Sequence, residues 1–84
     1  MKATVLVRPK AGILDPQGDA VRESLRKLGF PVEQARVGRL VDLDLATEDA
    51  NEARAQLERM AAELLANPLI ESFEIRVGPE AEGA

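Results

Sequence analysis

Cysteine, histidine, tryptophan and tyrosine are all absent from the sequence, and its only aromatic residues are Phe30 and Phe73. Without cysteine, the chain can form neither a disulfide nor a thiolate metal site. Without histidine, it lacks the usual general base and the commonest metal ligand. Two phenylalanines are too few for the base-stacking surfaces with which sheets bind RNA. The composition therefore argues against a catalyst acting alone and against a nucleic-acid partner.

Long apolar runs are missing as well. No segment approaches the roughly 18 residues of a membrane-spanning helix, and no charged-then-apolar signal peptide opens the chain. We therefore expect a cytoplasmic protein without a membrane partner. The 84 residues, 45% of them hydrophobic, suit one small domain with a modest core. We assign residues 1–78 to that domain and expect residues 79–84 to form a frayed tail, because they offer nothing to pack.

The net charge of the chain is −4, and the charge is unevenly distributed. Residues 1–40 carry eight Lys or Arg against four acids, whereas residues 41–84 carry three against eleven. The negative net charge is a second argument against nucleic acid. The uneven distribution can steer docking onto a charged partner surface, although two solvated faces of different composition would produce it too.

The first half of the chain predicts a strand, a loop and a helix. Residues 3–8 alternate small or β-branched apolar side chains with others, which predicts a strand. Asp15 suits the N-cap of a helix, and Pro16 suits its first position. An apolar stripe at helical spacing follows, formed by Val21, Leu25 and Leu28. Gly29 ends the helix in a left-handed conformation typical of a Schellman cap.

The second half predicts three strands and one helix. Residues 34–37 and 41–45 alternate in the same way and form two strands, separated by a tight turn or bulge. A second helix, capped by Thr47, runs to the stop signal at Asn67. Residues 70–77 form the last strand.

The element order is therefore βαββαβ, the ferredoxin-like split βαβ arrangement of the α+β class. Right-handed crossovers place both helices on one face of a four-stranded antiparallel sheet. Leu6 and Leu40 would lie on the other face, which no helix covers. We expect a homodimer, or a dimer of dimers, that pairs through this face and keeps it dry.

We find no complete catalytic, phosphate or metal site in the sequence. The two serines have no histidine to serve as their base. Lys10 could bind a phosphate near the start of the first helix, but Asp15 and Asp19 already occupy that positive end. Asp42 and Asp44 share a strand face without the loop geometry of a cation site, and a solvated face is the simpler interpretation.

The loop between the first strand and the first helix is the densest cluster of special residues. Residues 8–19 contain two prolines and two glycines, with apolar Ile13 and Leu14 in the middle. Such a loop is fixed more tightly than a solvated linker needs to be. A recognition element would have this composition, and so would a well-capped connection.

Four segments of the chain resemble one protein family. They are Val5-x-Val7-x-x-Lys10, Gly12-Ile13-Leu14-Asp15-Pro16-Gln17-Gly18, Leu25-x-x-Leu28-Gly29-Phe30 and Ala35-Arg36-x-Gly38-Arg39. In this order and spacing they resemble PurS, the small subunit of bacterial and archaeal phosphoribosylformylglycinamidine synthase, over about residues 3–78. Arg39 stands where the family often has lysine, which keeps the charge but changes the hydrogen-bond geometry.

The resemblance implies a role within a C–N ligase complex of de novo purine biosynthesis. Such a complex makes formylglycinamidine ribonucleotide from formylglycinamide ribonucleotide, glutamine and ATP. A glutaminase subunit, PurQ, releases ammonia, and a synthetase subunit, PurL, uses ATP and Mg²⁺. PurS-like chains are expected to bridge the two and to support ammonia transfer, with no catalytic residue, cofactor or metal of their own.

The resemblance also directs attention to particular side chains. Six candidates for partner contact are Lys10, Ile13, Leu14, Gln17, Arg36 and Arg39, because the core stripes do not explain them. Five residues are expected to set backbone geometry instead: Gly12, Asp15, Pro16, Gly18 and Gly38. The main alternative is a regulatory dimer of the ACT type, which has the same element order and would bind an amino acid at the loop.

Overall fold

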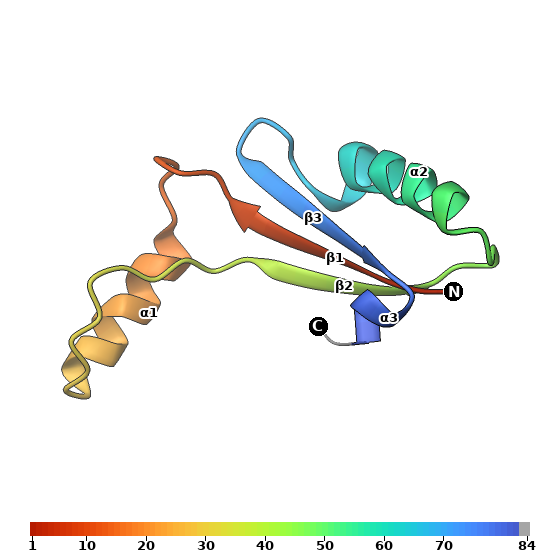
Figure 1. Ribbon diagram of the computed structural model, residues 1–84. Coiled ribbons are helices and arrows are strands. Elements are labelled where there is room, and N and C mark those ends of the chain that lie inside the picture. Colours follow the sequence, from red (N-terminus) through yellow and green to blue (C-terminus); the bar gives the residue numbers. More distant parts are fainter. Residues whose placement is uncertain (83–84) are drawn as a thin grey trace.

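A three-stranded antiparallel sheet organises the chain (Figure 1). The structure is a computed structural model that describes residues 1–82. Its elements are β1 (Lys2–Pro9), α1 (Pro16–Lys27), β2 (Arg39–Asp44), α2 (Ala50–Met60), the π-helical turn η1 (Ala61–Leu65), β3 (Glu71–Val77) and α3 (Pro79–Glu82). The strand order is β2-β1-β3, so the first strand of the sequence lies in the middle.

The core forms where α2 and η1 cover one face of β1. Val5 of β1 is fully buried and pairs with Val41 of β2 on one side and Ile75 of β3 on the other. The helical side contributes small or apolar residues, namely Ala53, Leu57 and Ala61. Leu57 is the largest fully buried side chain. The expected alternation of β1 is confirmed, and one short helix supplies most of the second layer.

The other face of the sheet is partly covered by the end of the chain. Residues 79–84 were expected to have nothing to pack against, but Pro79–Glu82 form α3, which contacts β1 and β3. Thr4 on this face is 1% exposed, and Ala81 is half-buried beside it. The final two residues lie outside the described range. Leu6 and Leu40, which pair across the strands, remain the apolar centre of this open face.

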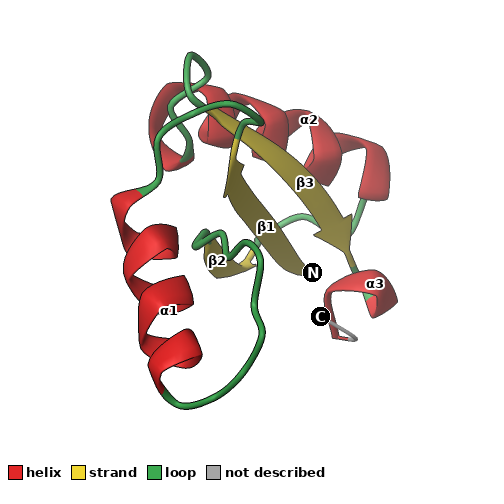
Figure 2. Ribbon diagram, turned by 90° about the vertical axis from the view of Figure 1, so that its left-hand side faces the viewer, coloured by secondary structure: helices red, strands yellow, loops and turns green. Residues whose placement is uncertain are grey.

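Helix α1 does not lie where the sequence places it. Both helices were expected on one face of the sheet, but α1 projects beyond the end of the strands, on the side of the sheet away from α2 (Figures 1 and 2). The chain measures 47 × 27 × 14 Å, with a radius of gyration of 15.5 Å. A compact domain of this length would have a radius of about 12 Å. We call residues 10–38, which comprise α1 and its two connections, the arm.

The expected strand at residues 34–37 is absent, so the sheet has three strands in the described chain and not four. The segment pairs with no strand. At its end the backbone N–H of Val37 donates instead to the Asp15 carboxylate, at 2.9 Å. An alternating pattern favours extended backbone, but it cannot provide the partner strand that a ladder needs.

The helix ends follow local rules with two differences. Asp15 caps α1 and Pro16 opens it, as expected, and Gly29 has a φ of +98° at its end. Asp49 caps α2 in place of the expected Thr47, because its carboxylate accepts from the N–H groups of Asn51 and Glu52. Helix α2 also changes to a π-helical turn after Met60, before the chain leaves the helix.

Candidate functional site: the base of the arm

Asp15 joins the two connections of the arm. Its Oδ1 accepts from the N–H of Gly18 at 3.0 Å, and its Oδ2 accepts from the N–H of Val37 at 2.9 Å. These hydrogen bonds, first that from Val37 and then that from Gly18, hold the pKa of the Asp15 carboxyl below its usual range, and the positive charge of Arg36 adds to the effect. A single carboxylate thus caps α1 and holds the returning segment against it.

Two glycines allow the chain segments to approach each other closely here. A Cβ on Gly18 would collide with the carbonyl oxygen of Ala35, and a Cβ on Gly38 would collide with that of Val7. Both obstacles are backbone atoms, which cannot move aside as a side chain can. Gly12 has a different role, since it has a φ of +81° and open space around it. A side chain at Gly18 or Gly38 would thus meet backbone atoms, and one at Gly12 would have to adopt a left-handed φ.

The side chains of Lys10 and Arg36 bind backbone carbonyls at the base of the arm. Arg36 Nη2 donates to the carbonyl oxygen of Lys10 at 2.6 Å, and Lys10 Nζ donates to that of Pro68 at 2.7 Å. The N–H of Lys10 donates to the carbonyl oxygen of Ile70 at 2.9 Å. Both side chains remain exposed at the surface. Lys10 fixes the arm to the loop before β3, Arg36 ties the two connections of the arm to each other, and both present positive charge at the surface.

Arg39 is held by Glu71 of the same chain, a contact that the sequence pattern did not indicate. Two of its guanidinium nitrogens donate to the two carboxylate oxygens of Glu71, at 2.6 and 2.9 Å, and Nη2 also donates to the carbonyl oxygen of Leu65 at 2.5 Å. The hydrogen bond from Arg39 is the main reason that the pKa of Glu71 is lowered, and the N–H of Asn67 is the second. A lysine could not form this two-pronged contact. Arg39 therefore ties β2 to η1 and β3.

The side chains of the three remaining candidates form no such hydrogen bond within residues 1–82. Ile13, Leu14 and Gln17 line an open groove together with Arg39 and Ile70. Leu14 is 80% exposed. Arg36 shares an adjacent hollow with Ile13 and Leu14, whereas Lys10 lies outside both. The structure thus brings five of the six candidates to one surface, and it adds Ile70, which the sequence pattern had assigned to a strand.

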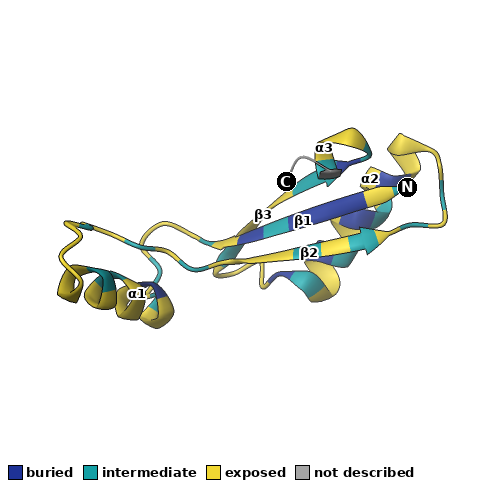
Figure 3. Cartoon of the chain, turned by 90° about the horizontal axis from the view of Figure 1, so that it is seen from below, coloured by how far each residue is buried: buried dark blue, intermediate teal, exposed yellow. Residues whose placement is uncertain are grey.

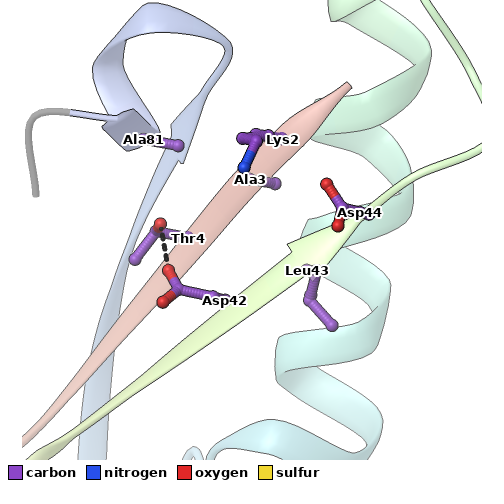
Figure 4. A pocket seen from close by; sticks show the side chains of 7 residues that line it. All are labelled: Lys2, Ala3, Thr4, Asp42, Leu43, Asp44 and Ala81. Atoms are coloured by element: carbon purple, nitrogen blue, oxygen red, sulfur yellow. Dashed lines mark hydrogen bonds between the residues drawn. The ribbon is translucent and has the colours of Figure 1, made fainter.

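A second hollow lies at the opposite end of the sheet (Figure 4). Thr4 Oγ1 donates to Asp42 Oδ1 at 2.8 Å, and Lys2 pairs with Asp44 across the strands. Among the described residues, no three acidic or other ligand side chains gather as a metal site would require. The same part of the chain has no helix that is both long and apolar enough to span a membrane.

At pH 7, we expect the Asp15→Asn chain to be less stable than the unchanged chain, because the amide offers one acceptor oxygen to two N–H donors. Since the pKa of the Asp15 carboxyl is lower in the folded chain, its contribution is complete above the ordinary value of 3.8 and is lost as the pH falls through the folded value. Urea unfolding should therefore show a difference at pH 7 that shrinks below pH 3.8. Asp19→Asn in the same helical turn is the matched control and should change little; equal losses for both variants would contradict the role of Asp15.

Comparisons with known proteins place the chain in a family. A family model described as PurS, phosphoribosylformylglycinamidine (FGAM) synthase, matches residues 2–79. The phosphoribosylformylglycinamidine synthase subunit PurS of Methanocaldococcus jannaschii is 35% identical over 77 residues, which cover 90% of this chain and 93% of that protein.

Solved structures agree with the sequence comparison. The structure of Thermus thermophilus PurS matches with a TM-score of 0.78 and 42% identity, over 93% of this chain and 96% of that one. A chain in the structure of PurLQS from Thermotoga maritima matches with a TM-score of 0.81 and 30% identity, over 89% of this chain and 93% of that one. The fold of this chain thus matches PurS structures over most of its length, and the chain belongs to the PurS family of phosphoribosylformylglycinamidine synthase subunits.

Proposed function

We propose that this chain is the non-catalytic assembly subunit of phosphoribosylformylglycinamidine synthase in de novo purine biosynthesis. It bridges a glutaminase subunit, PurQ, and a synthetase subunit, PurL, and supports the transfer of ammonia between them. The observation that carries the proposal is the match to a chain of the Thermotoga maritima PurLQS structure over most of both chains. The ligase activity belongs to the complex, in which ATP and Mg²⁺ bind to PurL. A cytoplasmic location is part of the same proposal.

The base of the arm is the surface we assign to partner contact. Ile13, Leu14 and Gln17 would enter the interface directly, since exposed apolar side chains on a fixed loop lose little entropy on binding. Lys10, Arg36 and Arg39 would contact the partner through the sides of their charged groups that do not bind the chain's own carbonyl oxygens or Glu71. The internal ties of these three residues support a preformed surface.

Gel filtration with PurL and PurQ in the presence of glutamine, ATP and Mg²⁺ tests this proposal. The unchanged chain should elute within the complex, and Leu14→Asp should elute apart from it, because the new charge is desolvated in the interface. Leu64→Asp, at a residue that is 82% exposed on η1, is the matched control and should remain in the complex. The absence of any complex with the unchanged chain, or tight binding of a free amino acid, would contradict the proposal.

The open face, which is the side of the sheet around Leu6 and Leu40, supports self-association of the chain. Leu6 is half-buried, and Leu40 opposite it is 47% exposed. Pairing two copies through this face, as a homodimer or as one step towards a dimer of dimers, would remove both side chains from water.

Leu6→Asp is expected to halve the mass of the assembly, because it places two carboxylates at the centre of the paired faces. Sedimentation equilibrium measures this mass directly, and Ser72→Asp at the rim of the same face is the control. An unchanged mass for Leu6→Asp would show that the open face is not the interface.

A further inference from the structure

One groove, where the sheet meets the arm, is lined by basic side chains and by no acidic side chain of the described residues. Its volume is about 600 Å³, and its charged lining residues are Arg8, Arg36 and Arg39. Four other hollows within residues 1–82 each include at least one Asp or Glu. A purely basic lining is unexpected in a chain whose net charge is −4. We call this hollow the arginine groove.

Arg8 has no acidic neighbour across the sheet. It pairs with the neutral Ser72 of β3. On its other side, the ladder with β2 begins only at Arg39, and no residue of that strand lies opposite Arg8. The guanidinium of Arg8 forms no hydrogen bond or ion pair within residues 1–82. By contrast, Arg76 on the same face of the sheet pairs with Glu74 at 3.3 Å.

Arg36 keeps donors free for a ligand although the arm holds its side chain in place. Its Nη2 donates to the carbonyl oxygen of Lys10 at 2.6 Å, which uses one of the guanidinium's N–H donors. The charge of Arg36 acts on the Asp15 carboxyl, but the two groups form no hydrogen bond or ion pair in the described chain. Arg39 contributes less, because two of its nitrogens already bind Glu71.

The arginine groove runs from the open face of the sheet towards the arm. Figure 3 views the sheet from the side away from α2, with α1 beyond one end of the strands and α3 near the other. Arg8 follows Leu6 along β1 on the same face, at the rim nearer the arm. Pro9 and Leu40 add apolar surface beside the arginines. The groove thus combines positive charge with an apolar wall.

We propose that the arginine groove binds a phosphate monoester. The phosphate group lies between the guanidinium groups of Arg8 and Arg36, with the hydroxyl of Ser72 as a further donor. A phosphate monoester carries about 1.5 to 2 negative charges and three acceptor oxygens, which suit two guanidinium groups better than a single carboxylate does. The rest of the ligand contacts Pro9 and Leu40. A volume of about 600 Å³ lies within the range of small-molecule sites.

Titration of the isolated chain with phenyl phosphate, followed by NMR of isotope-labelled protein, tests the proposal. Signals of residues 6–9, 36–40 and 72 should shift, and those of α2 should not. Arg8→Gln should weaken binding by about tenfold or more, because it removes a charge-assisted hydrogen bond. Arg8→Lys should bind with intermediate affinity, since it keeps the charge but loses the planar fork.

Arg76→Gln is the matched control, since it removes the same charge from the same face of the sheet. It should change the affinity by less than about twofold, because Arg76 is paired with Glu74 outside the groove. Circular dichroism checks that both variants are folded. Equal weakening by Arg8→Gln and Arg76→Gln, or the absence of shifts at the groove, would overturn the site.

Two further ligands test the assignment to a phosphate monoester. Inorganic phosphate should bind more weakly than phenyl phosphate, because it lacks the ring that contacts Pro9 and Leu40. Benzoate has the ring but a carboxylate in place of the phosphate, and it should bind more weakly as well. Equal binding of either ligand would overturn the assignment. PurL and PurQ are absent from these titrations, so failure here would leave the assembly role uncontradicted.

Discussion

A Gly38→Ala chain is expected to lose a large part of its stability. The added methyl group would collide with the backbone carbonyl oxygen of Val7, in the central strand of the sheet. Forcing an extra carbon into filled space costs about 1–3 kcal/mol, and the upper end is expected because the obstacle is backbone. A chain of this length has a total stability of about 4–13 kcal/mol. The melting temperature should therefore fall by about 10 °C or more.

Thermal unfolding followed by circular dichroism measures this change. Gln34→Ala, at an exposed position in the same returning segment, is the control and should unfold within about a degree of the unchanged chain. Gly18→Ala, whose methyl group would meet the carbonyl oxygen of Ala35, should behave like Gly38→Ala. If Gly38→Ala unfolded at the unchanged temperature, the close approach between the arm and β1 would not exist in solution.

The local structure of the chain follows from its sequence because its causes are local. Asp15 and Pro16 start α1 as their types predict, and the N–H of Phe30 donates to the carbonyl oxygen of Leu25 in the expected cap. The alternation of β1 likewise places Val5 in the core. Each of these features depends on residues that lie within a few positions of one another.

The arrangement of α1 and of residues 34–37 could not be predicted in the same way. The pattern of an amphipathic helix indicates a packing surface, and that of an alternating segment indicates a pairing strand. Neither pattern indicates whether that surface or strand lies in the same chain. The element order favours packing of α1 beside α2, and the joint at Asp15, Gly18 and Gly38 directs it elsewhere.

The partner-contact role of the candidate residues stays a prediction, and the structure adds where they lie. Ile13, Leu14 and Gln17 line one groove. Arg39, a candidate for partner contact, forms a two-pronged internal contact with Glu71, which lies 32 residues away. A contact over that distance has no signature in the local pattern. Its only sequence signal is the pair of opposite charges at the starts of β2 and β3, the two strands that flank β1.

Glutamine-dependent synthesis is expected to disappear when this chain is left out of the reconstituted complex, whereas ammonia-dependent synthesis should persist. An assembly subunit brings the ammonia source to the synthetase but takes no part in the ATP-dependent step. Free ammonia at high concentration replaces the ammonia that the glutaminase supplies and leaves the ATP-dependent step unaffected. The expected loss is therefore confined to the glutamine-dependent rate. A general loss of folding or activity would lower both rates.

Adding variants back makes the assay specific to the base of the arm. The unchanged chain should restore the glutamine-dependent rate, and Leu64→Asp should restore it equally well. Leu14→Asp should restore less than about a tenth of it, since a desolvated charge at an interface costs about 1.4 kcal/mol or more. Equal rescue by Leu14→Asp would show that the partner contact lies outside the arm, and it would leave the assembly role uncontradicted.

The ratio of glutamine-dependent to ammonia-dependent rates, measured with PurL and PurQ in the presence and absence of this chain, tests the central claim most directly. An assembly subunit predicts a ratio that falls towards zero without the chain, while the ammonia-dependent rate stays within a factor of about two. A ratio that is unchanged by the chain, or an ammonia-dependent rate that falls together with the glutamine-dependent one, would contradict it.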